Sequence, residues 1–166
     1  YAASSSCYGI IKKNIVNEEH PISLQHPYAL SKYLGEKALL HWGKIYNVPV
    51  VSLRIFNAYG PRVRTTGAYG AALGVFFKQK IKKKPFTVIG DGKQSRDFVH
   101  VKDLVKVFYK AAVSKIKFEK FNIGTGKSKS VNHLCRLLGG EKIRIPNRPG
   151  EAKHSTADIT KAKKLL

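Results

Sequence analysis

The sequence predicts an α/β fold built around a parallel sheet, and three observations support this. Segments of strand character alternate with segments of helical character along the chain, which is typical of α/β domains. The stretch 48–56 is a near-continuous apolar run, as expected of a parallel strand covered on both faces. At 166 residues the chain is long enough for one domain with a real core and too short for two of ordinary size.

The first elements follow from local signals. Residues 1–6 are expected to be the end of a buried strand that runs into a loop. The next helix begins at His26-Pro27, because proline is well placed in a first helical turn, and it extends to about Tyr46 with leucines at helical spacing. The apolar strand at 48–56 follows, and Gly60-Pro61 then breaks the chain.

The remaining elements are shorter. The glycines of Gly90-Asp91-Gly92 predict a tight turn. His100 is expected in a turn from strand to helix, with Asp103 in the first turn of an amphipathic helix. In chain order we expect a helix over 71–82, a strand over 86–89, a helix over 101–113, a strand over 121–123, a helix over 131–138, a strand over 143–145 and a helix from 160 on.

The net charge of +21 is the one extreme bulk property. Lysines outnumber arginines by 24 to seven and are scattered, with one cluster over 82–84. No zinc finger, helix-turn-helix or RNA-binding aromatic motif accompanies them, and arginine would dominate a surface that clamps phosphates bidentately. A lysine-rich proteome or an acidic half missing from the chain is the favoured interpretation. An anionic small substrate is the second, and nucleic acid is the least favoured.

Cysteine and histidine usage argues against a metal site or a disulfide framework. Cys7 and Cys135 form no CxxC pair, so we expect reduced thiols in a cytoplasmic protein. The six histidines show no metal-binding spacing. The sequence also has no apolar run long enough for a membrane helix and no secretory signal at its start. It contains no methionine, and we therefore expect it to be a fragment.

The sharpest chemical feature is Tyr28 followed four residues later by Lys32. Positions i and i+4 share one helix face, so the phenol and the ammonium can address one substrate. Free tyrosine has a pKa of about 10 and is a poor base at neutral pH, but a nearby positive charge favours the phenolate. The pair is therefore a device for removing a proton from an alcohol. Alone the pattern is weak, because a solvated helix face carries it by chance.

Other stretches match in order over nearly the whole chain. They are Tyr-Ala-Ala-Ser-Ser-Ser-Cys-Tyr-Gly at 1–9, Pro-Tyr-Ala-Leu-Ser-Lys at 27–32, Leu-Arg-Ile-Phe-Asn-Ala-Tyr-Gly-Pro-Arg at 53–62, Gly-Asp-Gly-Lys-Gln-Ser-Arg-Asp-Phe-Val-His-Val at 90–101 and Arg-Pro-Gly-Glu at 148–151. Together they resemble the extended short-chain dehydrogenases/reductases, the NAD-dependent epimerase/dehydratase family. Among these the sugar-nucleotide 4-epimerases that act on UDP-glucose are the most similar in motifs.

The resemblance implies roles for individual residues. Ser4, Tyr28 and Lys32 are the implied catalytic residues, with Ser4 hydrogen-bonded to the sugar oxygen that is oxidised. Tyr28 and Lys32 are also implied to contact the cofactor, NAD, with Lys32 on its ribose.

Further positions are implied to bind the nucleotide-sugar. They are Asn57, Arg96, Arg148 and, as a further candidate near the ribose, Glu151. The two arginines are implied to hold the diphosphate, which agrees with the bidentate hydrogen bonds of a guanidinium to phosphate. For each arginine a surface ion pair is the alternative. Ile55 departs from the tyrosine common there in the 4-epimerases.

Ser5 and Ser6 favour epimerisation over the other chemistries of the family. In its 4,6-dehydratases and decarboxylases, an acidic residue occupies one of the two positions after the catalytic serine or threonine. Serine at both positions leaves that chemistry without its acid. A dehydratase or decarboxylase remains the first alternative. A non-catalytic remnant that binds sugar nucleotides or a protein remains the second.

The resemblance also implies a domain organisation. Residues 1–57 would be the C-terminal part of a doubly wound, Rossmann-like parallel sheet with the active-site helix. Residues 58–166 would be mostly a smaller α/β substrate-binding lobe, with 101–123 packing back on the Rossmann-like sheet. The glycine-rich turn that binds NAD is absent from the sequence, so the isolated chain is expected to be inactive. The complete enzyme is expected to be a cytoplasmic homodimer that takes a UDP-sugar.

Overall fold

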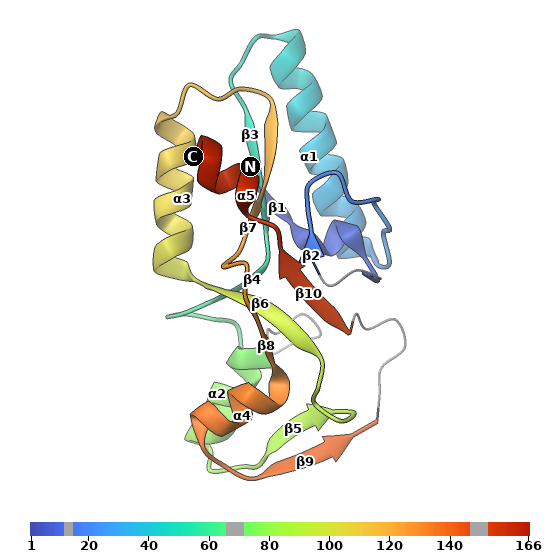
Figure 1. The fold of residues 1–166 in the computed structure, drawn as a ribbon, viewed down its shortest axis with the longest axis vertical. Helices are drawn as coiled ribbons and strands as arrows, with labels where there is room; N and C mark the ends of the chain where they lie inside the picture. The colour runs from blue at the N-terminus through green and yellow to red at the C-terminus, as the bar shows by residue number, and fades with distance from the viewer. Residues whose placement is uncertain (12–14, 66–71, 147–152) are drawn as a thin grey trace.

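A three-stranded parallel sheet lies between two helices in the upper half of the molecule (Figure 1). The structure is a computed structural model that describes residues 1–11, 15–65, 72–146 and 153–166. In the sheet, β3 (Val51–Ile55) pairs with β1 (Ala2–Ser4) on one side and β7 (Glu119–Ile123) on the other. Helix α1 (Pro27–Ile45) covers one face and α3 (Val101–Val113) the other.

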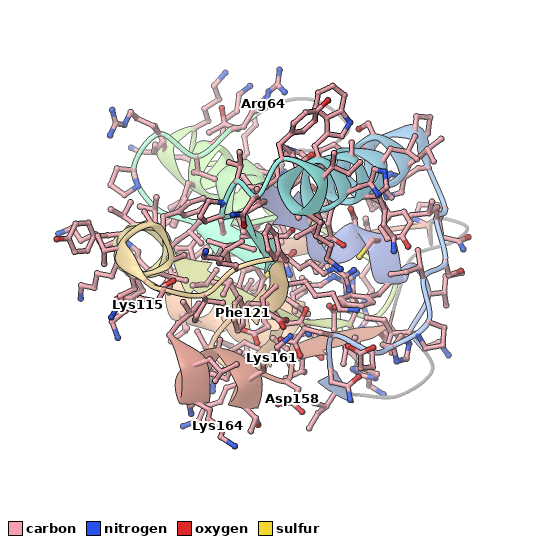
Figure 2. The ribbon with its side chains drawn as sticks, turned by 90° about the horizontal axis from the view of Figure 1, so that it is seen from above. Arg64, Lys115, Phe121, Asp158, Lys161 and Lys164 are labelled. Atoms are coloured by element: carbon pink, nitrogen blue, oxygen red, sulfur yellow. The ribbon has the colours of Figure 1, made fainter. Side chains whose placement is uncertain are left out.

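The sheet is held by apolar packing beneath α3. Leu53 and Phe121 are almost inaccessible and pack against Leu104 and Ile123. The short helix α5 (Thr160–Leu165) packs beside β7. Figure 2 shows Phe121 inside the molecule, whereas the side chains of Lys115 and Lys164 lie at its periphery. Removing this apolar surface from water drives the formation of the layer.

A second sheet continues downward from the first. Its strand order is β2 (Ile15–Val16), β10 (His154–Ala157), β6 (Ser95–His100) and β4 (Asn57–Tyr59). These pairs are parallel, and β8 (Ser128–Ser130) adds an antiparallel pair to β6. Because β4 follows β3 after a single residue, the second sheet begins where the first one ends.

The lower part of the molecule is a small lobe of its own. Strands β5 (Phe86–Ile89) and β9 (Lys142–Ile145) form a parallel pair beside α2 (Ala72–Ile81) and α4 (Val131–Leu138). Its core contains Phe76, Phe86, Val88 and Leu134. The lobe and the layer around β3 thus have separate apolar clusters.

Most predicted elements are confirmed with bounds that differ by only a few residues, and α3, α4 and β5 have the expected limits. The strand predicted over 48–56 is shorter, since β3 begins at Val51. Asn47 has a φ of 51°, and the N–H of Val48 donates to the carbonyl of Gly43, so this segment ends the helix. Pro49 has no N–H to give to a ladder.

Strands β2, β4, β6, β8 and β10 were not predicted, because β2 has only two residues and the others lack a continuous apolar pattern. Strand β6 carries the fully buried Asp97, and β10 reads His-Ser-Thr-Ala. The Asp97 carboxylate is satisfied by hydrogen bonds rather than by apolar burial. Within the described ranges, no helix is long and apolar enough to cross a membrane, and no group of acidic, histidine and cysteine side chains is arranged to hold a metal ion.

Candidate active site

Tyr28 lies in the first turn of α1, at the end of the helix nearest the second sheet. Pro27 is at the start of the helix, and His26 caps it by accepting a hydrogen bond at Nδ1 from the N–H of Ala29 at 3.2 Å. Ala29 is fully buried and seats this turn against the protein. The Tyr28 ring remains 39% exposed and can therefore meet a ligand.

Lys32 follows one turn later and is fixed against β1. Its ammonium donates to the carbonyl of Ala2 at 3.1 Å and lies 5.6 Å from the centroid of the Tyr1 ring. The Tyr1 hydroxyl in turn donates to the carbonyl of Lys32 at 3.3 Å. A side chain at Gly35 would meet that hydroxyl at 2.2 Å, so glycine permits the close approach of α1 to β1.

Ser4 stands at the carboxyl end of β1, where the chain enters the 3-10 helix η1 (Ser5–Tyr8). Its hydroxyl accepts a hydrogen bond from the N–H of Ser6 at 3.2 Å and so caps η1. The Ser6 hydroxyl oxygen is the only buried side-chain polar atom in the described part of the chain without a hydrogen-bond partner. Such an atom is costly unless a ligand or solvent satisfies it.

Asn57 and Arg96 lie on the neighbouring strands β4 and β6. The Asn57 amide donates to the backbone carbonyl of Asp97 at 3.3 Å, which ties the start of β4 to β6. Arg96 donates from Nη1 to the carbonyl of Ser95 at 2.9 Å. Both side chains are partly exposed.

These five predicted residues line one cavity of about 770 Å³ between the two sheets and the small lobe. They are Ser4, Tyr28, Lys32, Asn57 and Arg96. A smaller cavity of about 280 Å³ adjoins it and shares Ser4, Asn57 and Arg96 among its lining residues. Arg148 and Glu151, predicted on the same grounds, lie outside the described residues.

The charged side chains of the described residues that line these cavities are all positive. Lys32, Arg64 and Arg96 line the larger cavity, and no aspartate or glutamate of the described residues lines either one. Arg64 was not predicted, because the loop after β4 has no pattern to mark it. His26 lines both cavities and was predicted only as the start of a helix. The cavity thus suits an anionic, hydroxyl-rich ligand.

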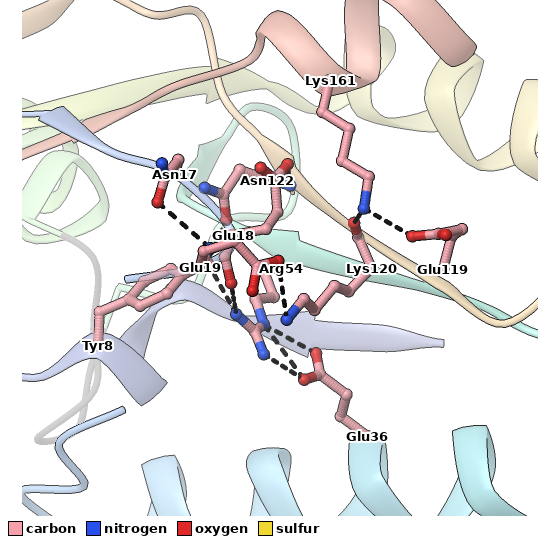
Figure 3. Close-up of polar contacts among 10 residues, drawn as sticks. All are labelled: Tyr8, Asn17, Glu18, Glu19, Glu36, Arg54, Glu119, Lys120, Asn122 and Lys161. Carbon is pink, nitrogen blue, oxygen red and sulfur yellow. Dashed lines mark hydrogen bonds and ion pairs between the residues drawn. The ribbon is translucent and has the colours of Figure 1, made fainter. Parts of the chain in front are cut away.

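A buried polar network fixes the elements behind the site (Figure 3). Arg54 on β3 pairs with Glu36 on α1, with Nε 3.0 Å from Oε2, and the Ser52 hydroxyl donates to the same carboxylate at 2.8 Å. Arg54 also donates to the Tyr8 hydroxyl at 2.9 Å, and that hydroxyl donates to Asn122 on β7 at 2.7 Å. The network therefore joins η1, α1, β3 and β7.

Burial governs the ionisation of this network. It raises the pKa of Tyr8 well above its ordinary value, so the hydroxyl stays protonated and can donate. Burial alone lowers the pKa of Arg54, but its hydrogen bonds to Glu36 outweigh this and the net shift is upward. Burial also raises the pKa of the Cys7 thiol to about 11. None of these three groups lines the cavities.

Asp97 organises the strand that carries Arg96. It is fully buried, and its carboxylate accepts hydrogen bonds from the N–H groups of Thr125, Gly126 and Ala157 at 2.8–3.1 Å. The turn at 124–128 is thus shaped by a carboxylate of the protein itself. Through these hydrogen bonds to Asp97, the turn and β10 are both attached to β6, the strand that carries Arg96.

Comparisons with known proteins show the family to which the chain belongs. The profile of the NAD dependent epimerase/dehydratase family matches residues 1–124. A putative UDP-glucose 4-epimerase of Methanocaldococcus jannaschii is 36% identical over an alignment of 170 residues that covers 99% of this chain and 55% of that protein. Decarboxylases are also among the relatives, including UDP-glucuronic acid decarboxylase 4 of Arabidopsis thaliana, which is 33% identical over an alignment of 153 residues that covers 89% of this chain and 34% of that protein.

Solved structures are similar over the same extent. The UDP-N-acetylglucosamine 4-epimerase of Methanobrevibacter ruminantium, in complex with UDP-N-acetylmuramic acid, has a TM-score of 0.92 and 31% identity over 99% of this chain and 55% of its own. The UDP-glucuronic acid 4-epimerase of Bacillus cereus, in complex with UDP-glucuronic acid and NAD, has a TM-score of 0.89 and 34% identity over 99% of this chain and 54% of its own. The chain spans about half the length of these proteins, corresponding to their C-terminal half.

Proposed function

The chain belongs to the NAD-dependent epimerase/dehydratase family, and we propose that it supplies the catalytic tyrosine and the sugar-nucleotide site of a 4-epimerase acting on UDP-sugars. One observation carries the proposal. Ser4, Tyr28 and Lys32 line the same cavity as Arg96, and no described carboxylate does so. An alcohol-deprotonating pair and a cation for phosphate thus face a single space.

The donors present at the cavity fit a nicotinamide nucleotide. An ammonium has three N–H donors, and Ala2 takes one from Lys32, which leaves donors for ribose hydroxyls. The cavity of about 770 Å³ also has apolar walls, including Ile55 and Val75. NAD, when bound, would supply the acceptor for the hydride that leaves the sugar C4 and, once reduced, the donor that returns this hydride to the other face of the 4-keto sugar.

The residues of the chain carry out the proton transfer and hold the substrate. Tyr28 takes the proton of the sugar 4-hydroxyl and later returns it to the same oxygen, so the overall reaction consumes no acid or base. Lys32 favours the phenolate form of Tyr28, and Ser4 donates a hydrogen bond to the reacting oxygen. Asn57 and Arg96 bind the nucleotide-sugar, with the guanidinium of Arg96 on the diphosphate. Arg148 and Glu151, which lie outside the described residues, add further contacts to the same ligand in this proposal.

Epimerisation is favoured over dehydration or decarboxylation by the same cavity. Those reactions need an additional acid or base at the sugar, whereas Ser5 and Ser6 stand at the two positions after Ser4. No aspartate or glutamate of the described residues lines either cavity, so none of them takes the place of that acid. A decarboxylase remains the second candidate, because decarboxylases are among the relatives.

We also propose that the complete enzyme is a cytoplasmic homodimer that pairs through α1. The outward face of this helix exposes Leu30, Leu34, Trp42 and Ile45 by 45–62%. An apolar stripe of this kind is stabilised when a second copy covers it. The two cysteines are free and buried, in keeping with a reducing compartment.

The experiment is a chimaera that joins the N-terminal half of the Methanocaldococcus jannaschii relative to this chain. We expect it to interconvert UDP-glucose and UDP-galactose without releasing carbon dioxide from UDP-glucuronate. Release of carbon dioxide would favour the decarboxylase. Tight binding of UDP-sugars without any turnover would favour a non-catalytic binding protein. A Tyr28→Phe chimaera is the matched control for turnover by the host half.

A further inference from the structure

His26 makes two contacts in addition to its capping hydrogen bond, and a typical helix-capping residue makes neither of them. Serine, threonine, aspartate and asparagine are the preferred caps, and each is compact. Here an imidazole takes that place, and its ring also lies nearly parallel to the Tyr28 ring, with 20° between the planes and 6.1 Å between the centroids. The same ring lines both cavities. His26 therefore contacts the tyrosine, the helix terminus and the ligand space together.

The cap determines the form of the imidazole. Because Nδ1 accepts the hydrogen bond from Ala29, the proton of the neutral ring is on Nε2. A protonated ring carries N–H on both nitrogens and cannot accept that bond. The charged and titratable groups that line the shared cavity with His26 are Tyr28 and Lys32 of α1, Arg64 after β4 and Arg96 of β6. In the form that caps the helix, the His26 ring is therefore neutral, and the cationic side chains of Lys32, Arg64 and Arg96 line the same cavity.

The backbone supports the same arrangement. His26 has φ −160° and ψ 161°, the extended conformation preferred before proline. Pro27 then sets the first helical turn, and the buried Ala29 anchors it. The rings of His26 and Tyr28 thus stand on a segment with little backbone freedom. The ring of the partly exposed Tyr28 is therefore stacked on one face against the His26 ring.

We propose that His26 is a positioning residue for Tyr28: it fixes the first turn of α1 through its cap and the plane of the phenol ring through stacking. The inference rests on the proposed function, in which the Tyr28 oxygen must point at the sugar 4-hydroxyl. The ring contact, rather than the cap, sets this direction. Loss of the ring changes the rate of the proton-transfer step and leaves binding of the sugar nucleotide nearly unchanged.

Two substitutions separate the contacts. His26→Asn keeps a strong cap and removes the ring. His26→Phe keeps a ring beside Tyr28 and removes the cap. His133→Asn on α4 is the matched control, because His133 lines neither cavity.

In the chimaera we expect His26→Asn to lower kcat about tenfold with KM within about twofold, since a misplacement of about 1 Å can cost on the order of a hundredfold. His26→Phe should keep kcat within about threefold and lower the melting temperature, as loss of a cap costs stability. His133→Asn should change neither constant. The idea is overturned if His26→Asn keeps more than half of kcat, or if His26→Phe loses as much as His26→Asn.

A second measurement does not depend on turnover. In the 166-residue chain labelled with 13C-tyrosine, we expect His26→Asn to shift the ring proton signals of Tyr28, because the ring current of the imidazole is lost. The signals of Tyr28 should be unmoved in His133→Asn. Identical Tyr28 signals in wild type and His26→Asn refute the positioning role. If the chimaera is inactive, the proposed function fails and this spectrum alone decides whether His26 holds the ring.

Discussion

Replacing Glu36 by alanine should destabilise the chain by about 3–5 kcal/mol, the usual result of removing one partner of a buried ion pair. The side chains of Glu36 and Arg54 are 2% and 3% exposed. Glu36 accepts hydrogen bonds from Ser52 Oγ and from Nε and Nη2 of Arg54. Without it, the buried guanidinium keeps only the Tyr8 hydroxyl and the Glu18 carbonyl, neither of which is charged.

Urea and thermal denaturation of the 166-residue chain measure this effect. For a chain of this length, 1 kcal/mol shifts the melting temperature by about 2–4 °C, so we expect a decrease of roughly 6–20 °C. Glu36→Gln should fall between wild type and Glu36→Ala, because the amide keeps one acceptor oxygen. Glu141→Ala is the control, since Glu141 is exposed and an exposed substitution usually changes stability by about 0.5 kcal/mol or less. A loss below about 1 kcal/mol for Glu36→Ala, the size of an exposed ion pair, would refute the reasoning.

The other predictions concern the site and the buried thiol. In the chimaera, Tyr28→Phe should abolish turnover with little change in UDP-sugar affinity, and a tenth of the activity remaining would contradict the general-base role. Lys32→Ala should lower the rate, because it removes the ammonium that is proposed to hold the cofactor ribose beside Tyr28; an unchanged rate would count against this. Arg96→Ala should weaken UDP-sugar binding, measured by calorimetry, by about 1.5–3 kcal/mol, the value of a hydrogen bond to a charged group. A change in rate alone would mean that the diphosphate binds elsewhere. Burial raises the pKa of Cys7 from 9.0 to about 11, so its contribution to stability is present below pH 9 and lost as the pH rises through 11. Cys7→Ala should therefore show a smaller loss of urea stability from pH 9 to 11 than wild type, and equal losses would argue against the shift.

The elements that could be predicted are those whose signal is local. Helix α3 carries an apolar stripe and begins with a capping residue, so its limits follow from neighbouring residues. Strand β3 has apolar residues at Val51, Leu53 and Ile55, and this pattern marks it as a strand in the sequence. The pair Tyr28 and Lys32 could be found because helical spacing alone puts both on one face.

The features that were missed depend on distant partners. Asp97 looks like a surface residue in the sequence, yet it is fully buried because N–H groups from the turn after β7 and from β10 reach it. Glu36 and Arg54 stand 18 residues apart on different elements, and only the packing of α1 on β3 pairs them. Arg64 lines the cavity from the segment after β4, and its backbone carbonyl lies close to Gly74 of α2. Neither spacing nor composition encodes that approach.

The positions of the aspartate and glutamate residues explain why the charged groups at the site are positive. The chain has only ten acidic residues against 31 lysines and arginines. Two of the buried acids are committed to protein groups, since Glu36 holds Arg54 and Asp97 holds backbone N–H groups. Because no described carboxylate lines the cavities, the positive potential of Lys32, Arg64 and Arg96 is not neutralised at short range. A concave surface of one sign concentrates counter-ions, so under the proposed function the scarcity of acids would favour capture of a diphosphate before any specific contact is made.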